Sequence, residues 1–505
     1  MDQAPAIVLL APFLTAVLVV LVGMKYERAC FPLVVLGLCC SAAAAVQTLL
    51  QVIEAGTLRY SMGGWPPPFG IEFRIDGLNA LVALTVSTVA LISAVYSKNR
   101  VPEENGDKIS IYYTLLLLVV TWLLGMVMTG DAFNLYVLLE VSALTSYALI
   151  AMGTRRATVA AFKYAIMGTI GASFYLLGVG YLYIKTGSLN MFDIHEVLVA
   201  ENLHQSTTVL VAFILITVGV WIKMAFFPLH AWLPNSYAFA PTTTSCLLGP
   251  LVTKVMVYVM IRMMLTVFDP LYTYLQLNWG NIVVWMAVIA ILAGSLAALA
   301  QTDLRRMLAF LIVAEVGYMV GGVWLANTAG LVGAIYHLIA DVFMTLCVFL
   351  FAGIVFAKTG KRDITATHGL FAKMPLTMAG LVVGALSLIG IPPTAGFFSK
   401  WYLIQGGMAA GHWGYVTALL ISSLAMAVLF FRVFEYAFFG VKPAEGHGDH
   451  HPSGKGKFSE ASASMLLPLL GTASLVLLIG IFNQSIVSII TDFVGQFNLT
   501  GSIMR

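Results

Sequence analysis

Eight ionisable side chains lie inside long apolar stretches of the sequence: Glu140, Lys163, Lys223, Lys254, Glu315, His337, Asp341 and Lys400. A charge in the middle of a bilayer costs about 2.5–3.5 kcal/mol on insertion scales, so such groups usually face protein or water and mark an ion pathway. Amines, carboxylates and an imidazole exchange protons when their surroundings change. The chemistry that these residue types offer is therefore proton transfer.

A lysine and a carboxylate suffice for a switchable relay. Separation of Lys223 from a carboxylate such as Glu140 would change the proton affinity of the amine. The alternative is a static buried ion pair that holds two helices in register. The distribution of acidic groups, a histidine and lysines over the middle of the chain favours the relay.

A second set of candidates shares one helix face. His337, Asp341 and Thr345 are spaced i, i+4 and i+8, which places them on one side of a helix. A histidine and a carboxylate one turn apart can pass a proton directly or through water. The alternative is a histidine satisfied by hydrogen bonds in an apolar core, but the adjacent Asp341 favours the relay.

Two of the lysines lie beside prolines. Pro228 follows Lys223 in "WIKMAFFPLHAWLPNSYAFAP", and Pro392 and Pro393 precede Lys400 in "LIGIPPTAGFFSKWYL". Proline removes a backbone donor and opens a helix, and the freed carbonyls are tolerated at membrane depth only beside protein or water. The alternative is an ordinary proline kink beside a lysine that reaches the interface. Because the two interrupted spans are five spans apart, we expect inverted repeats around a midplane ion site.

The elements that position these residues are transmembrane helices. The chain has 505 residues, of which 60% are hydrophobic and 10% charged, and its mean hydropathy is +0.94. The apolar runs are about 20 residues long and do not alternate, which predicts helices rather than a barrel. We predict an all-α polytopic membrane protein of about 14 spans, with two inverted five-helix repeats and discontinuous helices. Its parts are N-terminal helices 1–3 (1–109), a first repeat of helices 4–8 (110–268), a second repeat of helices 9–13 (269–440), a polar loop (441–462) and helix 14 (463–505).

Loop charges predict the orientation. The loops after even-numbered spans carry only Arg59, Arg74 and Lys185, whereas basic residues are frequent in the loops after odd-numbered spans. Positive loops stay in the cytoplasm, so both termini are expected outside, in the periplasm where there is one. We therefore expect a multi-pass protein of a bacterial or archaeal cell membrane, with the lipid bilayer as its solvent.

No motif for bound cofactors or nucleic acid is present. The sequence lacks a nucleotide-binding glycine loop, a nucleophile elbow, a cysteine cluster and a strongly basic stretch. The histidines of the polar loop, His447, His450 and His451, could bind metal, but neighbouring Gly, Pro, Ser and Lys favour a solvated loop. We expect no metal, no cofactor, and no redox or hydrolytic site in this chain.

Longer motifs resemble a known family. "NLYVLLEVSALTSYALI" surrounds Glu140, "AAFKYAIMGTIGASFYLLGVGYLY" contains Lys163, and "KMAFFPLHAWLPNSYAFAPTTTSCLLGPLVTKVMVY" contains two further lysines. With "QTDLRRMLAFLIVAEVGYM" and "GIPPTAGFFSKW", these segments resemble the antiporter-like membrane subunits of respiratory complex I and Mrp-type cation/proton antiporters. "TGSLNMFDI" and Lys400 look more like the D subunit of the Mrp antiporters.

The resemblance implies a relay. It implies fourteen helices, a pair between Glu140 and Lys223, a central Lys254, and Lys400 at the end of the second half-channel. The sequence departs from the family pattern where it has Thr345 in place of a lysine, Asp341 in place of a histidine, and Glu315 in place of a glutamine or histidine. The second half-channel has thus lost a cation and gained two carboxylates.

Three functions remain open. The first is a proton-translocating subunit of a multisubunit Mrp-like Na⁺/proton antiporter with a relay through Glu140, Lys223, Lys254, His337/Asp341 and Lys400, supported by Lys163 and Glu315. The second is a pumping subunit of a redox complex, such as NADH:quinone oxidoreductase or a membrane-bound hydrogenase. The third is a scaffold that no longer conducts, which Thr345 suggests. In each case the expected partners are other membrane subunits, and the expected cargo is the proton, with Na⁺ as a second candidate.

Overall fold

The structure is a computed structural model that describes residues 3–439 and 460–497. The three histidines of the polar loop lie outside the described residues. The α-helices are α1 (Ala4–Gly23), α2 (Cys30–Ala55), α3 (Gly77–Asn105), α4 (Ile109–Met128), α5 (Ala132–Ala151), α6 (Arg155–Thr186), α7 (Met191–Ala200), α8 (Thr207–Lys223), α9 (Leu233–Phe239), α10 (Thr242–Arg262), α11 (Gly280–Leu299), α12 (Leu304–Trp324), α13 (Thr328–Thr359), α14 (Leu370–Lys373), α15 (Pro375–Ile389), α16 (Ala395–Ala409), α17 (Trp413–Phe439), α18 (Ala463–Ile481) and α19 (Asn483–Gly495).

The predicted polytopic helical fold is confirmed. Eleven stretches of the described residues are long and apolar enough to cross a membrane, and one of them, Gly77–Met128, contains both α3 and α4. The shorter apolar helices α8 and α15 lie at the two predicted interruptions. If α8 and α9 are counted as one crossing, and α15 and α16 as another, the described helices give the expected number of about fourteen crossings.

Both predicted interruptions occur where the prolines lie. Helix α8 ends at Lys223 itself, and the chain then crosses Pro228 before α9 begins at Leu233. Helix α15 ends at Ile389, and α16 begins after the two adjacent prolines. Because proline lacks the backbone donor that helix continuation needs, the local sequence explains both breaks.

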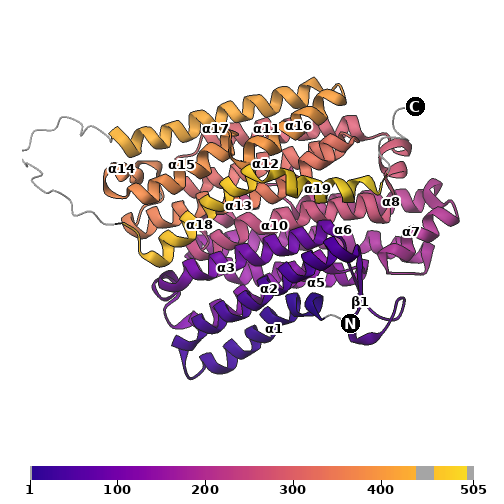
Figure 1. Cartoon of the computed structure of the whole chain (residues 1–505), viewed down its shortest axis with the longest axis horizontal. Coiled ribbons are helices and arrows are strands. Elements are labelled where there is room, and N and C mark those ends of the chain that lie inside the picture. The colour runs from indigo at the N-terminus through magenta and orange to yellow at the C-terminus, as the bar shows by residue number, and fades with distance from the viewer. Residues whose placement is uncertain (1–2, 440–459, 498–505) are drawn as a thin grey trace, which may run out of the picture.

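Three helices form the centre of the molecule. The spanning parts of α10 and α13 are fully buried, and α12 is almost so. Figure 1 shows them in the middle of the bundle, with α1 and α2 along one edge and α17 along the other. Most of the candidate residues of the second half lie on these three helices, which explains how so many polar groups are kept away from lipid.

A small β-hairpin and the short helix α7 lie at one end of the bundle. Strands β1 (Leu58–Ser61) and β2 (Glu72–Ile75) pair antiparallel. Figure 1 shows β1, α7 and the start of α1 on the side opposite α14. We call this end, defined by β1 and β2, the hairpin face. The sequence predictions did not include the hairpin or α7.

The last predicted span was too long. We expected a single helix 14 within residues 463–505, but α18 ends at Ile481 and α19 is a separate helix. The residues Val487, Ile490, Phe493 and Val494 of α19 are buried, and the helix presents polar residues elsewhere. One apolar face and one polar face are typical of a helix that lies along a surface rather than across a bilayer.

Helices α6 and α8 approach each other through glycines. A Cβ placed on Gly219 would lie 2.5 Å from the carbonyl oxygen of Gly171, which no side chain can tolerate without movement of the backbone. Small residues at such positions allow two membrane helices to pack closely. This packing fixes α8, and therefore Lys223 at its end, against α6.

We predict that Gly219→Ala lowers stability by about 1–3 kcal/mol, because overpacking forces the two backbones apart. The matched control is Gly180→Ala on α6, where a Cβ would meet nothing within 4 Å. Thermal unfolding of the purified protein in detergent measures both. Equal midpoints for the two variants would contradict this account of the α6–α8 contact.

Candidate functional site

The first cluster joins α5 to the broken end of α8. The Nζ atom of Lys223 lies 3.2 Å from Oε1 of Glu140, so the two residues form the ion pair that the resemblance implies. The lysine side chain is buried, whereas that of Glu140 is 21% exposed. A Cβ on Gly168 of α6 would lie 1.8 Å from the Tyr147 hydroxyl and 3.5 Å from the Lys223 Nζ. Glycine at this position therefore leaves room for the polar ends of both side chains.

A small cavity extends from Lys223 toward α10. Its volume is about 10 Å³, which is close to the space that one water molecule needs. Its wall includes the hydroxyl-bearing residues Ser142 and Ser146, and Val252 and Met256 of α10. These two residues lie two positions before and after Lys254, so they share a face of α10 turned away from that lysine, and the cavity lies between the first cluster and this face of α10.

The second cluster joins α10 to α13. The Nζ atom of Lys254 lies 3.0 Å from Oδ2 of Asp341 and 3.4 Å from Oγ1 of Thr345. The Thr345 hydroxyl donates to Oδ1 of Asp341 over 2.7 Å. All three residues are buried. Asp341 is therefore the counter-ion of Lys254.

The third cluster joins α12, α13 and α16. His337 lies 2.5 Å from Oε2 of Glu315 through Nε2 and 2.9 Å from Oγ of Ser399 through Nδ1. The other carboxylate oxygen of Glu315, Oε1, is buried and has no hydrogen-bond partner within residues 3–439 and 460–497. We expected His337 to exchange a proton with Asp341 on its own helix, but its hydrogen-bond partners come from two other helices.

The fourth cluster surrounds Lys400. Its Nζ donates to the carbonyl oxygen of Leu388 at 2.6 Å and to Oγ of Ser423 at 3.0 Å, and lies 3.4 Å from the carbonyl oxygen of Ile389. In a continuous helix these two carbonyls would accept from the residues four positions later, which are Pro392 and Pro393 and have no N–H. The two prolines therefore free the carbonyls that hold the ammonium.

Lys163 lies apart from these clusters. Its side chain is exposed on α6, where it lines a surface hollow with Arg155, Arg156 and Asn235. Within the described residues it forms no ion pair. We expected a supporting role because apolar residues precede and follow Lys163 in the sequence. In the structure these residues belong to α6, an outer helix with one exposed face.

One group of donors has the geometry of a metal site. Glu315, His337 and Asp341 each offer an atom, and the three atoms lie within 4.8 Å of one another. However, the ammonium of Lys254 already lies 3.0 Å from Asp341 and would repel a cation bound there. The arrangement is better suited to protons shared among the side chains than to a resident ion.

The sequence did not single out the hydroxyl and aromatic groups that surround His337 and Lys400. Ser399, Ser423 and Tyr318 contact His337 or Lys400, and the ring of Tyr318 lies 5.2 Å from the Lys400 Nζ. Most hydroxyls in these helices bond their own backbone instead, as Thr121 does with the carbonyl of Leu117. For Ser399, the only indication in the sequence was its position directly before Lys400.

Comparisons with known proteins agree with the fold and the motifs. A profile of the family described as "NADH:quinone oxidoreductase/Mrp antiporter, TM" matches residues 129–425. NADH-quinone oxidoreductase subunit N of Desulforudis audaxviator is 42% identical over 502 residues, which cover 97% of this chain and 98% of that protein. The D subunit of the Na(+)/H(+) antiporter of Bacillus subtilis is 31% identical over 471 residues, which cover 92% of each.

Solved structures share the whole architecture. A chain of the membrane-bound sulfane sulfur reductase, an archaeal respiratory membrane complex, superposes with a TM-score of 0.88 at 27% identity and covers 99% of both chains. The matched proteins thus include subunits named for a quinone oxidoreductase, an antiporter and a sulfur reductase, all on one fold.

We predict that Asp341→Asn destabilises the protein by about 3–5 kcal/mol, because removal of one partner leaves Lys254 as an unpaired buried charge. The double variant Lys254→Gln, Asp341→Asn should recover most of this loss, because it leaves no charge at the pair. Thermal unfolding in detergent measures the cycle, with the exposed Lys163→Gln as a near-neutral control. Additive losses in the double variant would contradict the coupling.

Proposed function

Because the chain belongs to the family of NADH:quinone oxidoreductase and Mrp antiporter membrane subunits, we propose that it translocates protons as one subunit of a multisubunit Mrp-like cation/proton antiporter. The observation that supports this most is the set of four buried polar clusters, which follow one another across α5, α8, α10, α13 and α16. A chain that only held partners together would not need charges at this depth, where each one is costly.

The relay begins with Lys223 and Glu140. When the pair separates, the lysine loses the charge that stabilises its proton, and the proton moves toward α10 through the small cavity beside Lys223. Lys254 receives it beside Asp341. The hydroxyl of Thr345 holds the other oxygen of this carboxylate, which keeps the acceptor in place.

The second half passes the proton onward. If Lys254 loses its proton, Asp341 becomes a buried carboxylate without a counter-ion, and such a group attracts a proton strongly. His337 and Glu315 lie close enough to supply it, since their donor atoms are within 4.8 Å of the Asp341 carboxylate. Ser399 connects the histidine to the helix that carries Lys400, the last group of the path.

Two inverted repeats account for the two proline breaks. We assign the first repeat to residues 110–268 and the second to residues 269–440, with both termini outside the cell. Moving one charge across 100 mV is worth about 2.3 kcal/mol, so a membrane potential or a cation gradient can drive the cycle. The coupled cation in this proposal is Na⁺, which the name of the antiporter relatives supports.

A redox-driven pump is the second candidate. The relative that is 42% identical over nearly the whole chain is named as one subunit of a quinone oxidoreductase. The same relay serves both functions, because the redox groups of such a complex reside in other subunits. The partners in the cell therefore distinguish the two.

We predict that Lys254→Ala, in a complex that still assembles, lowers proton transport in membrane vesicles at least ten-fold, because the central carrier is lost. Lys223→Ala should act in the same way, whereas Lys163→Ala, outside the clusters, should retain transport. A pH-sensitive dye in vesicles measures all three, and co-purification of the other subunits measures assembly. Undiminished transport by both assembled relay variants would refute the path and favour a scaffold.

We also predict the companions of the intact complex. Purification from the native membrane and mass spectrometry should identify other antiporter subunits and no iron–sulfur or nickel protein, because an antiporter needs no electron carrier. Recovery of an iron–sulfur or nickel protein in stoichiometric amount would overturn the antiporter assignment in favour of the redox pump.

A further inference from the structure

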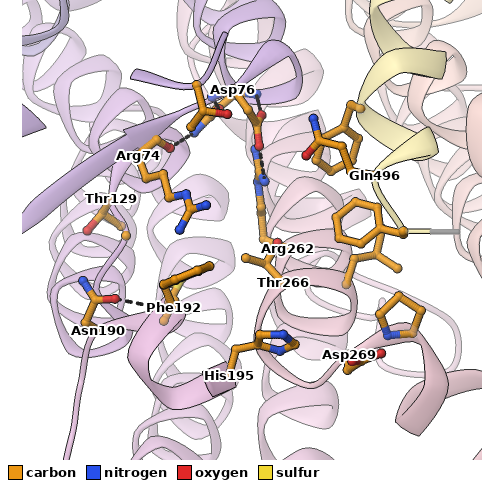
Figure 2. Close-up of a pocket in the computed structure, with 18 of the residues that line it drawn as sticks. Arg74, Asp76, Thr129, Asn190, Phe192, His195, Arg262, Thr266, Asp269 and Gln496 are labelled. Carbon is orange, nitrogen blue, oxygen red and sulfur yellow. Dashed lines mark hydrogen bonds and ion pairs between the residues drawn. The ribbon is translucent and has the colours of Figure 1, made fainter. Parts of the chain in front are cut away.

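A cavity of about 480 Å³ opens at the hairpin face, away from the four clusters. Its walls come from β2, the start of α3, α7, the end of α10 and α19. Figure 2 shows Arg74, Asp76, His195, Arg262 and Gln496 around it. Most of these side chains are polar, so the cavity is suited to water. None of these five residues belongs to the proposed relay.

The inner end of this cavity lies close to the central lysine. Lys254, Tyr258 and Arg262 are spaced i, i+4 and i+8 on α10, so they share one face. Both Tyr258 and Arg262 line the cavity. At 1.5 Å per residue, Lys254 lies about 6 Å deeper along the helix axis than Tyr258. One turn of helix therefore separates the cavity from the Lys254 position.

An ion pair closes this short interval. The guanidinium of Arg262 donates to both oxygens of Asp76, from Nη1 at 2.7 Å and from Nη2 at 2.5 Å. Its Nε donates to the Tyr258 hydroxyl at 3.0 Å, and this hydroxyl donates to the carbonyl of Val127 at 2.7 Å. Figure 2 shows the Asp76–Arg262 contact at the cavity. The network connects α3, α4 and α10 across the route from the cavity to Lys254.

The surroundings allow this pair to separate. The side chains of Arg262 and Asp76 are 12% and 11% exposed, so water already reaches them from the cavity. A π-helical turn, Met263–Val267, directly follows Arg262, and such turns are frequent at functional sites. The ring of Phe493 from α19 lies 5.0 Å from the guanidinium carbon. Movement of α19 or of this turn would therefore act on the pair.

We propose that the Asp76–Arg262 ion pair, with Tyr258, is a gate between Lys254 and water at the hairpin face, and that protons exchange with the relay through it. The described state is the closed one. The gate gives the first half of the chain its own access to the side that carries β1 and β2. The proposal rests on the proposed function, because it requires Lys254 to carry protons.

Cysteine accessibility tests the gate without any need for transport. The reporter is Lys254→Cys with Asp341→Asn, which leaves no unpaired charge, in a background whose five native cysteines are replaced by alanine. A small membrane-impermeant thiol reagent is added outside sealed vesicles of each orientation. Thr266→Cys, on the cavity wall, identifies the vesicles whose hairpin face is accessible.

The gate is opened by Asp76→Asn. Asparagine is as good an N-cap as aspartate, so it removes the charge while it can still cap α3, where Asp76 accepts from the backbone of Leu78 and Asn79. Arg262→Gln breaks the same pair from the other side. The control is Glu104→Gln, which removes a partner of Arg100 at the other end of α3.

We predict that Asp76→Asn or Arg262→Gln accelerates labelling of the reporter from the hairpin face at least ten-fold, whereas Glu104→Gln leaves the rate unchanged. Unchanged labelling in both gate variants, with Thr266→Cys still labelled, would overturn the gate. In vesicles with native Lys254, Asp76→Asn should also cause a proton leak that Lys254→Ala removes. Faster labelling without this leak would keep the access route and refute the proton role of Lys254.

Discussion

The buried ion pair between Lys254 and Asp341 is the interaction on which the centre of the molecule depends. Both side chains are almost wholly buried, on the two helices whose spanning parts are fully covered by the rest of the protein. A charge at this depth is tolerated only with a partner, because neither water nor hydrocarbon is available to stabilise it. The pair therefore fixes α10 against α13. It also gives Asp341 a counter-ion on another helix, while the Thr345 hydroxyl on its own helix donates to the other carboxylate oxygen.

The two lysines beside the proline breaks also need partners for a buried ammonium, and they find different ones. Among the described residues no carboxylate contacts Lys400, and its ammonium instead donates to two carbonyls that the adjacent prolines cannot bond. Lys223, at the other break, has a carboxylate partner that is partly exposed. The two lysines at the breaks are thus stabilised unequally, one by a charge and one by dipoles. A proton that leaves Lys400 creates no unpaired anion beside it, whereas a proton that leaves Lys223 does.

The hairpin face adds a second ion pair with a different character. Asp76 and Arg262 lie beside a cavity that is large enough for many waters, and their side chains are partly exposed. Water from the cavity can take over the hydrogen bonds of these two charges when they separate, whereas Lys254 and Asp341 are almost wholly buried. The chain therefore carries a pair that is sealed from solvent at its centre and a hydrated pair where our proposal places a gate. Lys254 of the buried pair and Arg262 of the hydrated pair lie on the same face of α10.

The sequence by itself determined the membrane class, the helical architecture, the two interruptions and the candidate residues. These follow from local causes: long apolar runs require helices, prolines cannot continue them, and ionisable residues in such runs stand out. The β-hairpin and the separate α19 were not predicted, because short elements at a surface lack a strong periodic signal. The exposure of Lys163 was not predicted either, since apolar flanks do not distinguish an outer helix from a central one.

Only the tertiary structure decided the partners. Within one helix, His337 and Asp341 are neighbours, yet the fold pairs His337 with Glu315 and Asp341 with Lys254. The hydroxyls of Ser399 and Ser423, and the carbonyls around Lys400, became visible only once distant helices were packed together. Sequence spacing fixes which residues share a face, but a contact between helices depends on how those faces are turned toward each other, and side-chain packing across the whole bundle sets that rotation.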